Sequence, residues 1–380
     1  MKKFWVSALA VLLAIGLSIP AVAATFKIGD ADFKLSGSIR VNAAYQFTDK
    51  GDIKVGTEDS ETDFFIKNPG NSRGSVWAKY ENVSGFIEYG VRDDSDSRDS
   101  LYARHVFLSY DMGEGNSFTV GQTWSLLGLH FANNEMNYSR SMFGFGNLYA
   151  GRVPVVRFTH KGDVTFNIEL ENTDTKDQPG FISNEMLPAL AGNLIYKTGG
   201  LTLTPSFLVQ QYELTSTADG IDDIDVLGYA LCLDTVYKLD MVTIDAQVWY
   251  AQNGAIFADA FDAVRVAGGA LSGFGAPVYD LATGDIEDIN SYGGWLQFTV
   301  PVDKNAVSLG AGYQQSEIDD TVGTEDDWSR YGLFANYRVN LTPQFFVQPE
   351  VAYYNYGEDV DGVNEYGSDT FVGVHFRYNF

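Results

Sequence analysis

The stretch that runs from Phe33 to Phe47, FKLSGSIRVNAAYQF, alternates in character along its whole length. Its odd positions are apolar or small, and its even positions are mostly polar, with Arg40 and Asn42 among them. A period of two residues indicates a β-strand, because successive side chains in a strand point to opposite faces. The stretch is also longer than the roughly 9–11 residues with which a tilted strand crosses a membrane. It therefore predicts a long strand with one apolar face and one polar face.

The same alternation recurs along the rest of the chain, at 74–80, 227–236, 242–251, 292–300, 307–313, 331–339 and 347–353. The connectors between such segments are alternately short, as at 81–85 and 113–116, and long, as at 48–72 and 125–151. Outer-membrane barrels join their strands in this way, with short periplasmic turns and longer external loops. The pattern predicts an all-β protein, a transmembrane antiparallel up-and-down β-barrel of about 16 strands with both chain ends on the periplasmic side.

The last seven residues, VHFRYNF, continue the alternation to the end of the chain. The sequence predicts that Val374, Phe376, Tyr378 and Phe380 face lipid and that His375, Arg377 and Asn379 face the lumen. Pairing of this strand with the stretch 33–47 would close the barrel and remove its unpaired edges.

The amino-terminal residues predict an export signal. Lys2 and Lys3 precede an apolar run from Phe4 to Ile19, which is followed by Pro20 and the small residues AVAA. This layout is typical of a cleaved secretory signal peptide. A membrane-spanning helix is the alternative, but the run is slightly short of the roughly 20 apolar residues that such a helix needs. We expect residues 1–23 to be removed, or 1–24 if cleavage falls one residue later, and residues 24–380 to form the barrel.

The composition suits a membrane barrel although the mean hydropathy is only −0.11. A barrel places its lipid-facing residues at alternate positions, so its average remains moderately polar. The chain contains 22 Tyr and 26 Phe but only 10 Pro, and aromatic residues form the girdles at the two membrane interfaces. The formal net charge of −25 argues against a nucleic acid as partner. The single cysteine, Cys232, excludes an intramolecular disulfide.

Several features together resemble the trimeric general diffusion porins of bacterial outer membranes. They are the signal peptide, the alternating connectors, the long third loop between FTVGQTW (118–124) and GRVPVVRF (151–158), and the terminal HFRYNF. The resemblance implies a homotrimer in the outer membrane of a Gram-negative bacterium, in contact with lipid and lipopolysaccharide. It also implies that the barrel assembly machinery reads Phe376, Tyr378 and Phe380, although Phe380 could equally anchor the chain in an interfacial girdle.

In those porins the third loop folds into the barrel, and arginines on the wall face carboxylates on the loop. By this resemblance Arg73, Arg104 and Arg152 match the wall arginines, and Arg40 shares the polar face of the first strand. Opposed charges across a narrow pore orient polar solutes and set ion selectivity. The alternative for each arginine is a structural ion pair near the rim of the barrel.

The third loop departs from that family in its charge. It carries a single carboxylate, Glu135, where the family usually has at least two, and SMFGFG (141–146) stands where the family has an acidic glycine-rich motif. Several arginines facing one glutamate predict a weak preference for anions. The external loops predict the opposite, because they are rich in Asp and Glu and an acidic mouth concentrates cations within about 8 Å. The sign of the selectivity therefore stays open at the level of sequence.

Two segments break the simple alternation. The segment 101–110 is apolar at both parities apart from Arg104 and His105, which predicts a strand buried on both faces, one of them at a subunit interface. Arg152 and Arg157 have opposite parity, so one of them would face lipid unless the strand contains a β-bulge. Pro154, which lacks an N–H donor, is the candidate for that bulge.

Evidence for a bound metal is weak. Asp359, Asp361 and Glu365 surround Gly362 in a spacing that faintly resembles a calcium loop, but the remaining ligands are missing. A solvated acidic loop explains the same residues. We expect no cofactor, with Ca²⁺ or Mg²⁺ bound by the external loops as the exception.

The sequence thus predicts a water-filled channel for passive diffusion of small hydrophilic solutes and ions. Catalytic motifs are missing at recognisable spacing, which argues against an enzyme. One alternative is a channel selective for a sugar or a small anion. A more remote alternative is a structural or adhesive barrel whose acidic loops bind divalent cations.

Overall fold

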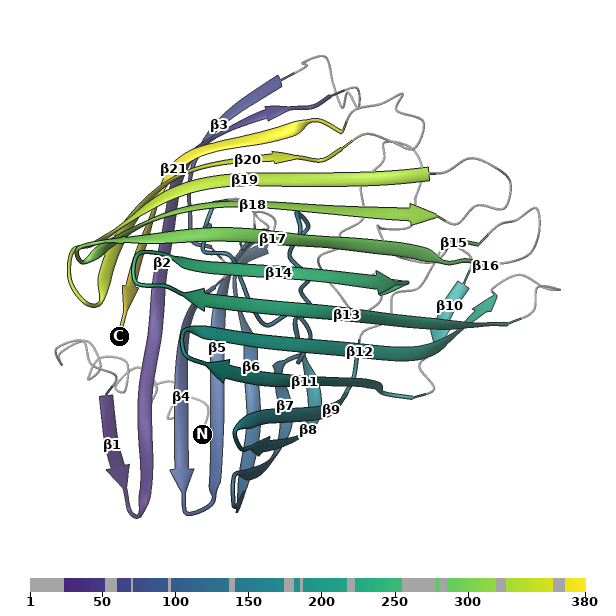
Figure 1. Cartoon of the computed structure of the whole chain (residues 1–380). Coiled ribbons are helices and arrows are strands. Elements are labelled where there is room, and N and C mark those ends of the chain that lie inside the picture. Colours follow the sequence, from purple (N-terminus) through teal and green to yellow (C-terminus); the bar gives the residue numbers. More distant parts are fainter. Residues whose placement is uncertain are drawn as a thin grey trace.

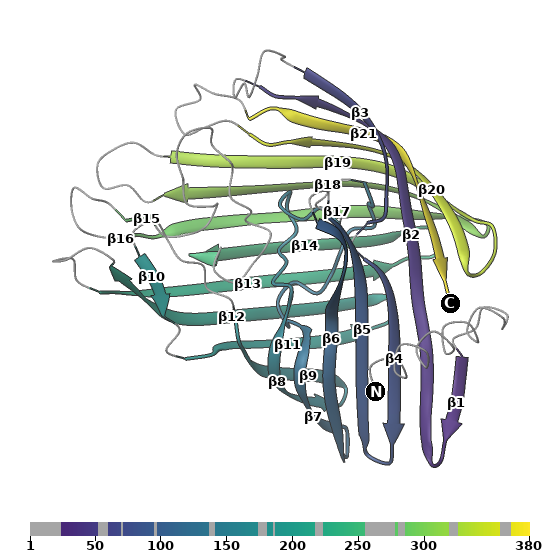
Figure 2. The same cartoon turned by 180° about the vertical axis from the view of Figure 1, so that it is seen from behind.

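A computed structural model describes residues 24–51, 60–69, 71–94, 97–136, 141–173, 181–184, 187–216, 223–254, 278–279, 286–318, 326–357 and 366–380. These residues form a closed antiparallel β-barrel with 16 strand positions, as the sequence predicts (Figures 1 and 2). Within the described ranges no helix is long and apolar enough to cross a membrane.

The strands follow one another around the barrel in chain order. They are β1 (Ala24–Ile28), β2 (Ala31–Asp49), β3 (Ser60–Lys67), β4 (Ser72–Tyr80), β5 (Val83–Asp94), β6 (Ser97–Gly113), β7 (Asn116–Trp124), β8 (Arg152–Lys161), β9 (Val164–Glu171), β10 (Phe181–Asn184), β11 (Ala189–Thr198), β12 (Leu201–Ser216), β13 (Ile224–Lys238), β14 (Thr243–Gln252), β15 (Val278–Tyr279), β16 (Ile286–Glu287), β17 (Ile289–Val302), β18 (Asn305–Ile318), β19 (Asp326–Asn340), β20 (Phe345–Asn355) and β21 (Ser368–Asn379). Both β3 and β4 pair with β2, and both β10 and β11 pair with β12, so each of these couples fills one strand position. The short strands β15 and β16 pair only with each other.

The barrel closes where β2 meets β21, which confirms the predicted pairing of the last strand with 33–47. The register runs from Ser38 opposite Asn379 to Asp49 opposite Ser368. Beyond it, Gly37 and Phe380 exchange two backbone hydrogen bonds of 2.8 and 3.1 Å. The short strand β1 then pairs with residues 31–35 of β2. The last residue of the chain and the strand β1 therefore lie end to end along one edge of β2 (Figure 1).

Alternation sorts the side chains between the two faces of the wall. On β2, Tyr45 and Phe47 are half exposed, whereas Arg40 and Asn42 are buried inside the barrel. Large exposed apolar side chains recur on strands all around the outer surface, which is the surface that a membrane barrel presents to lipid. The polar residues of the same strands accordingly line the interior.

The inner wall from β11 to β14 contains an apolar patch among polar residues. Small or hydrophobic side chains of this patch, among them Ala191, Ala230 and Cys232, belong to one buried cluster with Leu126 and Leu148 of the third loop. We call residues 125–151 loop 3; its described parts, 125–136 and 141–151, thus fill part of the barrel, as predicted. Burial of apolar surface stabilises this packing by about 25 cal/mol per Å².

Strand β6 contains a β-bulge that explains its apolar residues at both parities. Glu88 of β5 pairs with His105 and Tyr89 pairs with Ala103, so Arg104 is the extra residue. Arg104 and His105 are consequently both buried although they are neighbours in sequence, with exposures of 4% and 6%. The outward side chains on either side of the bulge, Leu101, Val106 and Leu108, are exposed in the single chain, so burial of this face stays a prediction that depends on a subunit interface.

Candidate functional site

Loop 3 begins with a turn that is fixed by two buried carboxylates of β9. The hydroxyl of Ser125 donates a hydrogen bond to Glu171 at 2.6 Å, and the backbone N–H of Leu126 donates to Glu169 at 2.8 Å. The other carboxylate oxygen of Glu169 accepts from Nε of Arg157 at 2.6 Å. This arrangement balances one of the two carboxylates by an ion pair and ties the start of the loop to the wall.

The backbone of loop 3 is bonded to polar side chains on the inner face of the barrel. Besides that of Leu126, several of its N–H groups donate to wall side chains, including Asn133 to Gln297 (2.8 Å), Met136 to Glu350 (2.8 Å), Gly146 to Gln314 (3.2 Å) and Leu148 to Gln247 (2.7 Å). Wall side chains also donate to its carbonyls, as Asn42 does to Glu135 (2.8 Å) and Trp249 to Gly146 (2.7 Å). A backbone segment inside a barrel needs such partners, since unpaired buried polar groups are costly.

The segment SMFGFG of loop 3 lies directly on the backbone of β17 and β18. A Cβ atom on Gly146, which has a φ of +108°, would lie 2.2 Å from the carbonyl oxygen of Gly294. A Cβ on Gly312 would lie 2.1 Å from the carbonyl oxygen of Phe145. These glycines therefore permit the close contact of loop and wall.

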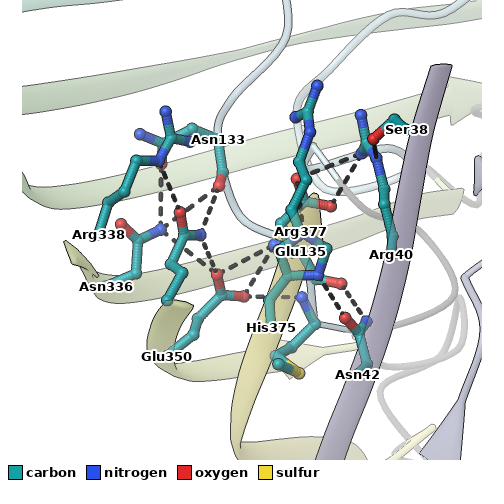
Figure 3. Close-up of polar contacts among 12 residues, drawn as sticks. Ser38, Arg40, Asn42, Asn133, Glu135, Asn336, Arg338, Glu350, His375 and Arg377 are labelled. Atoms are coloured by element: carbon teal, nitrogen blue, oxygen red, sulfur yellow. Dashed lines mark hydrogen bonds and ion pairs between the residues drawn. The ribbon is translucent and has the colours of Figure 1, made fainter. Parts of the chain in front are cut away.

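Glu135 of loop 3 and Arg40 of β2, which the sequence places on the polar face of its strand, lie together. The Nη1 atom of Arg40 is 3.4 Å from each carboxylate oxygen of Glu135, and both side chains are almost fully buried. His375 of β21 places Nε2 at 3.7 Å from the same carboxylate. Glu350 of β20 accepts hydrogen bonds from the backbone N–H of Glu135 at 3.0 Å (Figure 3). One loop carboxylate thus meets one arginine and one histidine of the wall.

Arg73 and Arg104 share a carboxylate that sequence reasoning missed. Glu88 of β5 lies 3.2 Å from Nε of Arg73 and 2.7 Å from Nε of Arg104. Arg104 also donates from Nη1 to the hydroxyl of Tyr102 at 2.9 Å. The signal in the sequence was slight, because Glu88 is a single carboxylate on the inward face of an otherwise ordinary strand. Both alternatives raised for these arginines therefore apply in part, since they line the interior and are ion paired.

Arg152 is positioned differently from the other three predicted arginines. Its guanidinium lies over the ring of Trp124, 4.5 Å from the centroid, and it interacts electrostatically with Arg104. No ion pair to Arg152 occurs among the residues that the structure describes. The register between β7 and β8 is continuous, so the bulge expected at Pro154 does not occur in this pairing. Arg152 reaches the interior as the first residue of β8, while Arg157 follows the inward parity.

Two further arginines of the inner wall, Arg338 of β19 and Arg377 of β21, interact electrostatically with Glu135 (Figure 3). The alternation in the sequence predicts that Arg377 lies on the polar face, but no motif in the sequence points to Arg338. The ring of Phe346 on the intervening strand β20 contacts both guanidinium groups.

Other predicted sites lie away from this cluster or outside the described residues. The side chain of Phe376 is exposed on the outer face, and the rings of Tyr378 and Phe380 stack with centroids 6.1 Å apart. Asp359, Asp361 and Glu365 and the predicted signal segment 1–23 fall outside the residues that the structure describes. Among the residues that the structure does describe, no group of three or more His, Cys, Asp or Glu side chains could hold a metal ion.

No model of a known protein family matches the chain, and no curated protein sequence matches it. Solved structures do match. The outer membrane channel DcaP of Acinetobacter baumannii is 20% identical with a TM-score of 0.73, over 94% of this chain and 100% of that one. The anion-selective porin from Comamonas acidovorans is 14% identical with a TM-score of 0.60, over 92% and 100%. OmpF of Salmonella typhi, in a complex with daunomycin, is 13% identical with a TM-score of 0.59, over 94% and 100%. The chain therefore has the fold of outer-membrane porins.

Proposed function

We propose that the protein is an outer-membrane porin of a Gram-negative bacterium, a water-filled channel for passive diffusion of small hydrophilic solutes that prefers anions. In this role it is not an enzyme. It assembles as a homotrimer in contact with lipid and lipopolysaccharide, and the barrel assembly machinery recognises Phe376, Tyr378 and Phe380. The fold supports the channel, and the charge around loop 3 supports the preference for anions.

The balance of charge inside the barrel carries the proposal. Six arginines lie near the two ion-paired carboxylates Glu88 and Glu135, namely Arg40, Arg73, Arg104, Arg152, Arg338 and Arg377. Two further buried carboxylates bond to the backbone of loop 3: Glu350 beside Glu135, and Glu169, which is paired with Arg157. Guanidinium groups remain charged at all physiological pH values, and charges interact strongly where little water is present. The acidic external loops act over about 8 Å at physiological salt, so the groups at the narrowest point dominate selection.

The reversal potential of the purified protein in a planar bilayer under a KCl gradient tests this proposal. We expect the sign that corresponds to chloride permeating faster than potassium. Replacement of Arg73, Arg104 and Arg152 together by Gln should shift the reversal potential toward cation preference, because three positive charges leave the interior. A wild-type protein that prefers potassium would contradict the proposal.

A matched control removes three positive charges from the short-turn rim of the barrel, away from the residues that contact loop 3. Lys161, Lys197 and Lys238 are exposed at the short-turn ends of their strands. Their replacement by Gln should leave the reversal potential close to that of the wild type. Retention of heat-modifiable mobility on gels would show that each triple variant is a folded barrel.

A further inference from the structure

Four rings form a connected row on the inner wall at β5, β6 and β7. The ring centroids of Phe86 and Phe107 lie 5.5 Å apart, and both rings contact that of His105, at 5.8 and 6.4 Å. His105 in turn lies 5.4 Å from Trp124, the last residue of β7. Phe86 and Phe107 are register partners on the inward face, since the neighbours of Phe107 on both sides are exposed on the outer surface. The row therefore leads from the short-turn half of the wall to the start of loop 3.

Three rings of loop 3 continue this row. The ring centroids of Phe131 and Tyr149 lie 5.5 and 5.7 Å from that of Trp124. Phe143 lies 5.6 Å from Phe131 and stacks on Tyr149 at 4.3 Å. We call the four rings of the wall and these three rings of the loop the aromatic ladder. Its members form one continuous set that joins the wall to the loop.

The aromatic ladder lies outside the buried apolar clusters that anchor loop 3. One of these clusters includes side chains of β11 to β14, and the other includes side chains of β17, β19, β20 and β21. As far as the described residues define them, neither cluster contains a ring of the ladder. Phe86 and Phe107 on the wall and Trp124, Phe131 and Phe143 at the loop are only half-buried. Partly exposed aromatic surface inside a water-filled barrel favours the binding of apolar groups, because a solute that covers it removes apolar area from water.

The angles between the rings indicate which solute fits. Neighbouring ring planes meet at 61° and 63° on the two sides of His105, and at 86° between Phe131 and Phe143. The ladder thus presents ring edges as well as ring faces. A sugar lacks a π system and needs flat open faces, but Arg152 already lies over the ring of Trp124 at 4.5 Å. An aromatic solute can pair with an edge or with a face, at centroid distances of about 4.5–7 Å.

We propose that the aromatic ladder binds solutes that carry a planar aromatic ring and guides them along the wall and past loop 3. This inference rests on the proposed function as a diffusion channel, but not on its preference for anions, because the contacts are made between rings. An aromatic solute joins the ladder as a further ring and moves by exchanging one ring contact for the next. Each such contact is weak, so the solute is retained briefly and still passes.

Phenyl β-glucoside is the probe that tests the ladder, because it is uncharged and carries one aromatic ring. Cyclohexyl β-glucoside is the matched probe, with a ring of similar size that is not aromatic. KCl current through single channels is measured while each glucoside is added. Phenyl β-glucoside should reduce the current with a saturable dependence on concentration, and the half-inhibiting concentration of the cyclohexyl compound should be about two- to tenfold higher. A linear effect of phenyl β-glucoside, or equal inhibition by the two compounds, would overturn the ladder.

Replacement of Phe131 and Phe143 together by Leu removes two loop rings and keeps apolar side chains in their place. The half-inhibiting concentration of phenyl β-glucoside should rise by about two- to tenfold. Phe65→Leu is the matched control, because Phe65 is also half-buried but packs against a buried cluster and contacts Phe371 instead of the ladder. It should leave the inhibition unchanged. An equal loss of inhibition in Phe65→Leu would mean that the ladder is not the binding surface.

A second double variant guards against a shift of loop 3 in the first one. Phe86 and Phe107 lie on paired strands of the wall, so their replacement by Leu leaves the bonds between loop 3 and the wall in place. Inhibition by phenyl β-glucoside should again weaken, and unchanged inhibition would overturn a ladder that joins wall and loop. Swelling of liposomes in methyl β-glucoside tests the channel separately. Liposomes that do not admit this small solute would contradict the proposed function.

Discussion

At the scale of single residues, the arginines inside the barrel differ in what balances their charge. Arg73 and Arg104 share Glu88, Arg40 meets Glu135, and Arg152 lies on the ring of Trp124. Removing one partner of a buried ion pair is costly because the other charge stays buried and unbalanced. Glu88 therefore holds two arginines in place and, in the proposed channel, would also reduce the positive charge that solutes meet.

Replacement of Glu88 by Gln keeps the shape of the side chain and removes its charge. We expect the free energy of unfolding to fall by about 1–3 kcal/mol, because Arg73 and Arg104 lose a charged acceptor. The reversal potential under a KCl gradient should move further toward chloride. Glu81, which is exposed in the turn after β4, offers a control: Glu81→Gln should change neither urea unfolding nor reversal potential. Unchanged selectivity in Glu88→Gln would show that this carboxylate lies outside the conducting path.

The sequence predicts on which face of the strand these arginines lie, but it does not predict which residues they contact. Parity alone places Arg40 and Arg377 on the polar face, since side chains alternate strictly along a strand. It does not reveal that Glu88 meets Arg104, because the contact depends on the register of β5 with β6 and on the bulge between them. The contacts of Arg338 and Arg377 with the ring of Phe346 likewise depend on the register of β20, which the alternation leaves undetermined.

At the scale of elements, loop 3 behaves as an inner layer of the barrel. Its backbone is bonded to inward side chains of several strands, and its glycine-rich part touches the backbone of β17 and β18. The sequence predicts that the loop folds inward, but not where it rests. Gln247, Gln297 and Gln314 look like ordinary polar-face residues until the loop supplies N–H groups for them. The apolar patch on the inner face of β11 to β14 has the same explanation, because side chains of the loop pack against it.

Gly312→Ala tests whether this contact sets the size of the passage. The new methyl group would meet the carbonyl oxygen of Phe145 at 2.1 Å, so loop 3 must shift away from β18. We expect a changed single-channel conductance together with a free energy of unfolding lowered by about 1–3 kcal/mol. Gly74→Ala is the matched control, since an added Cβ there meets no atom within 4 Å. Equal conductance in both variants would show that the loop position does not control the passage.

At the scale of the whole molecule, the outer surface must divide between lipid and neighbouring subunits. The proposed trimer requires an apolar face that water and lipid do not occupy. The exposed side chains Leu101, Val106 and Leu108 on both sides of the β6 bulge are the candidate for this face. The sequence predicts the apolar character of this strand, but the bulge decides which of its residues point outward.

Leu108→Arg should dissociate the proposed trimer, because a charge would be buried between subunits. Native mass spectrometry or native gels of the detergent-solubilised protein would measure the oligomeric state. Leu231→Arg is the control: it places the same charge on the exposed face of β13, with a cost of about 2–4 kcal/mol at the membrane midplane, and should leave trimers intact. Intact trimers in Leu108→Arg would exclude this strand from the interface.

Phe380 and β1 lie end to end along β2, so the first and last residues of the barrel are close neighbours in space. Phe380 bonds to Gly37, and Ala24 pairs with Leu35 only two positions away on the same strand. A short linker could therefore join residues 380 and 24, and the chain could be opened instead at a short turn such as 199–200. Such a circular permutant should regain the same barrel, with wild-type heat-modifiable mobility after refolding in detergent. Failure to refold would mean that the order in which strands are made, and not the closed sheet alone, determines the structure.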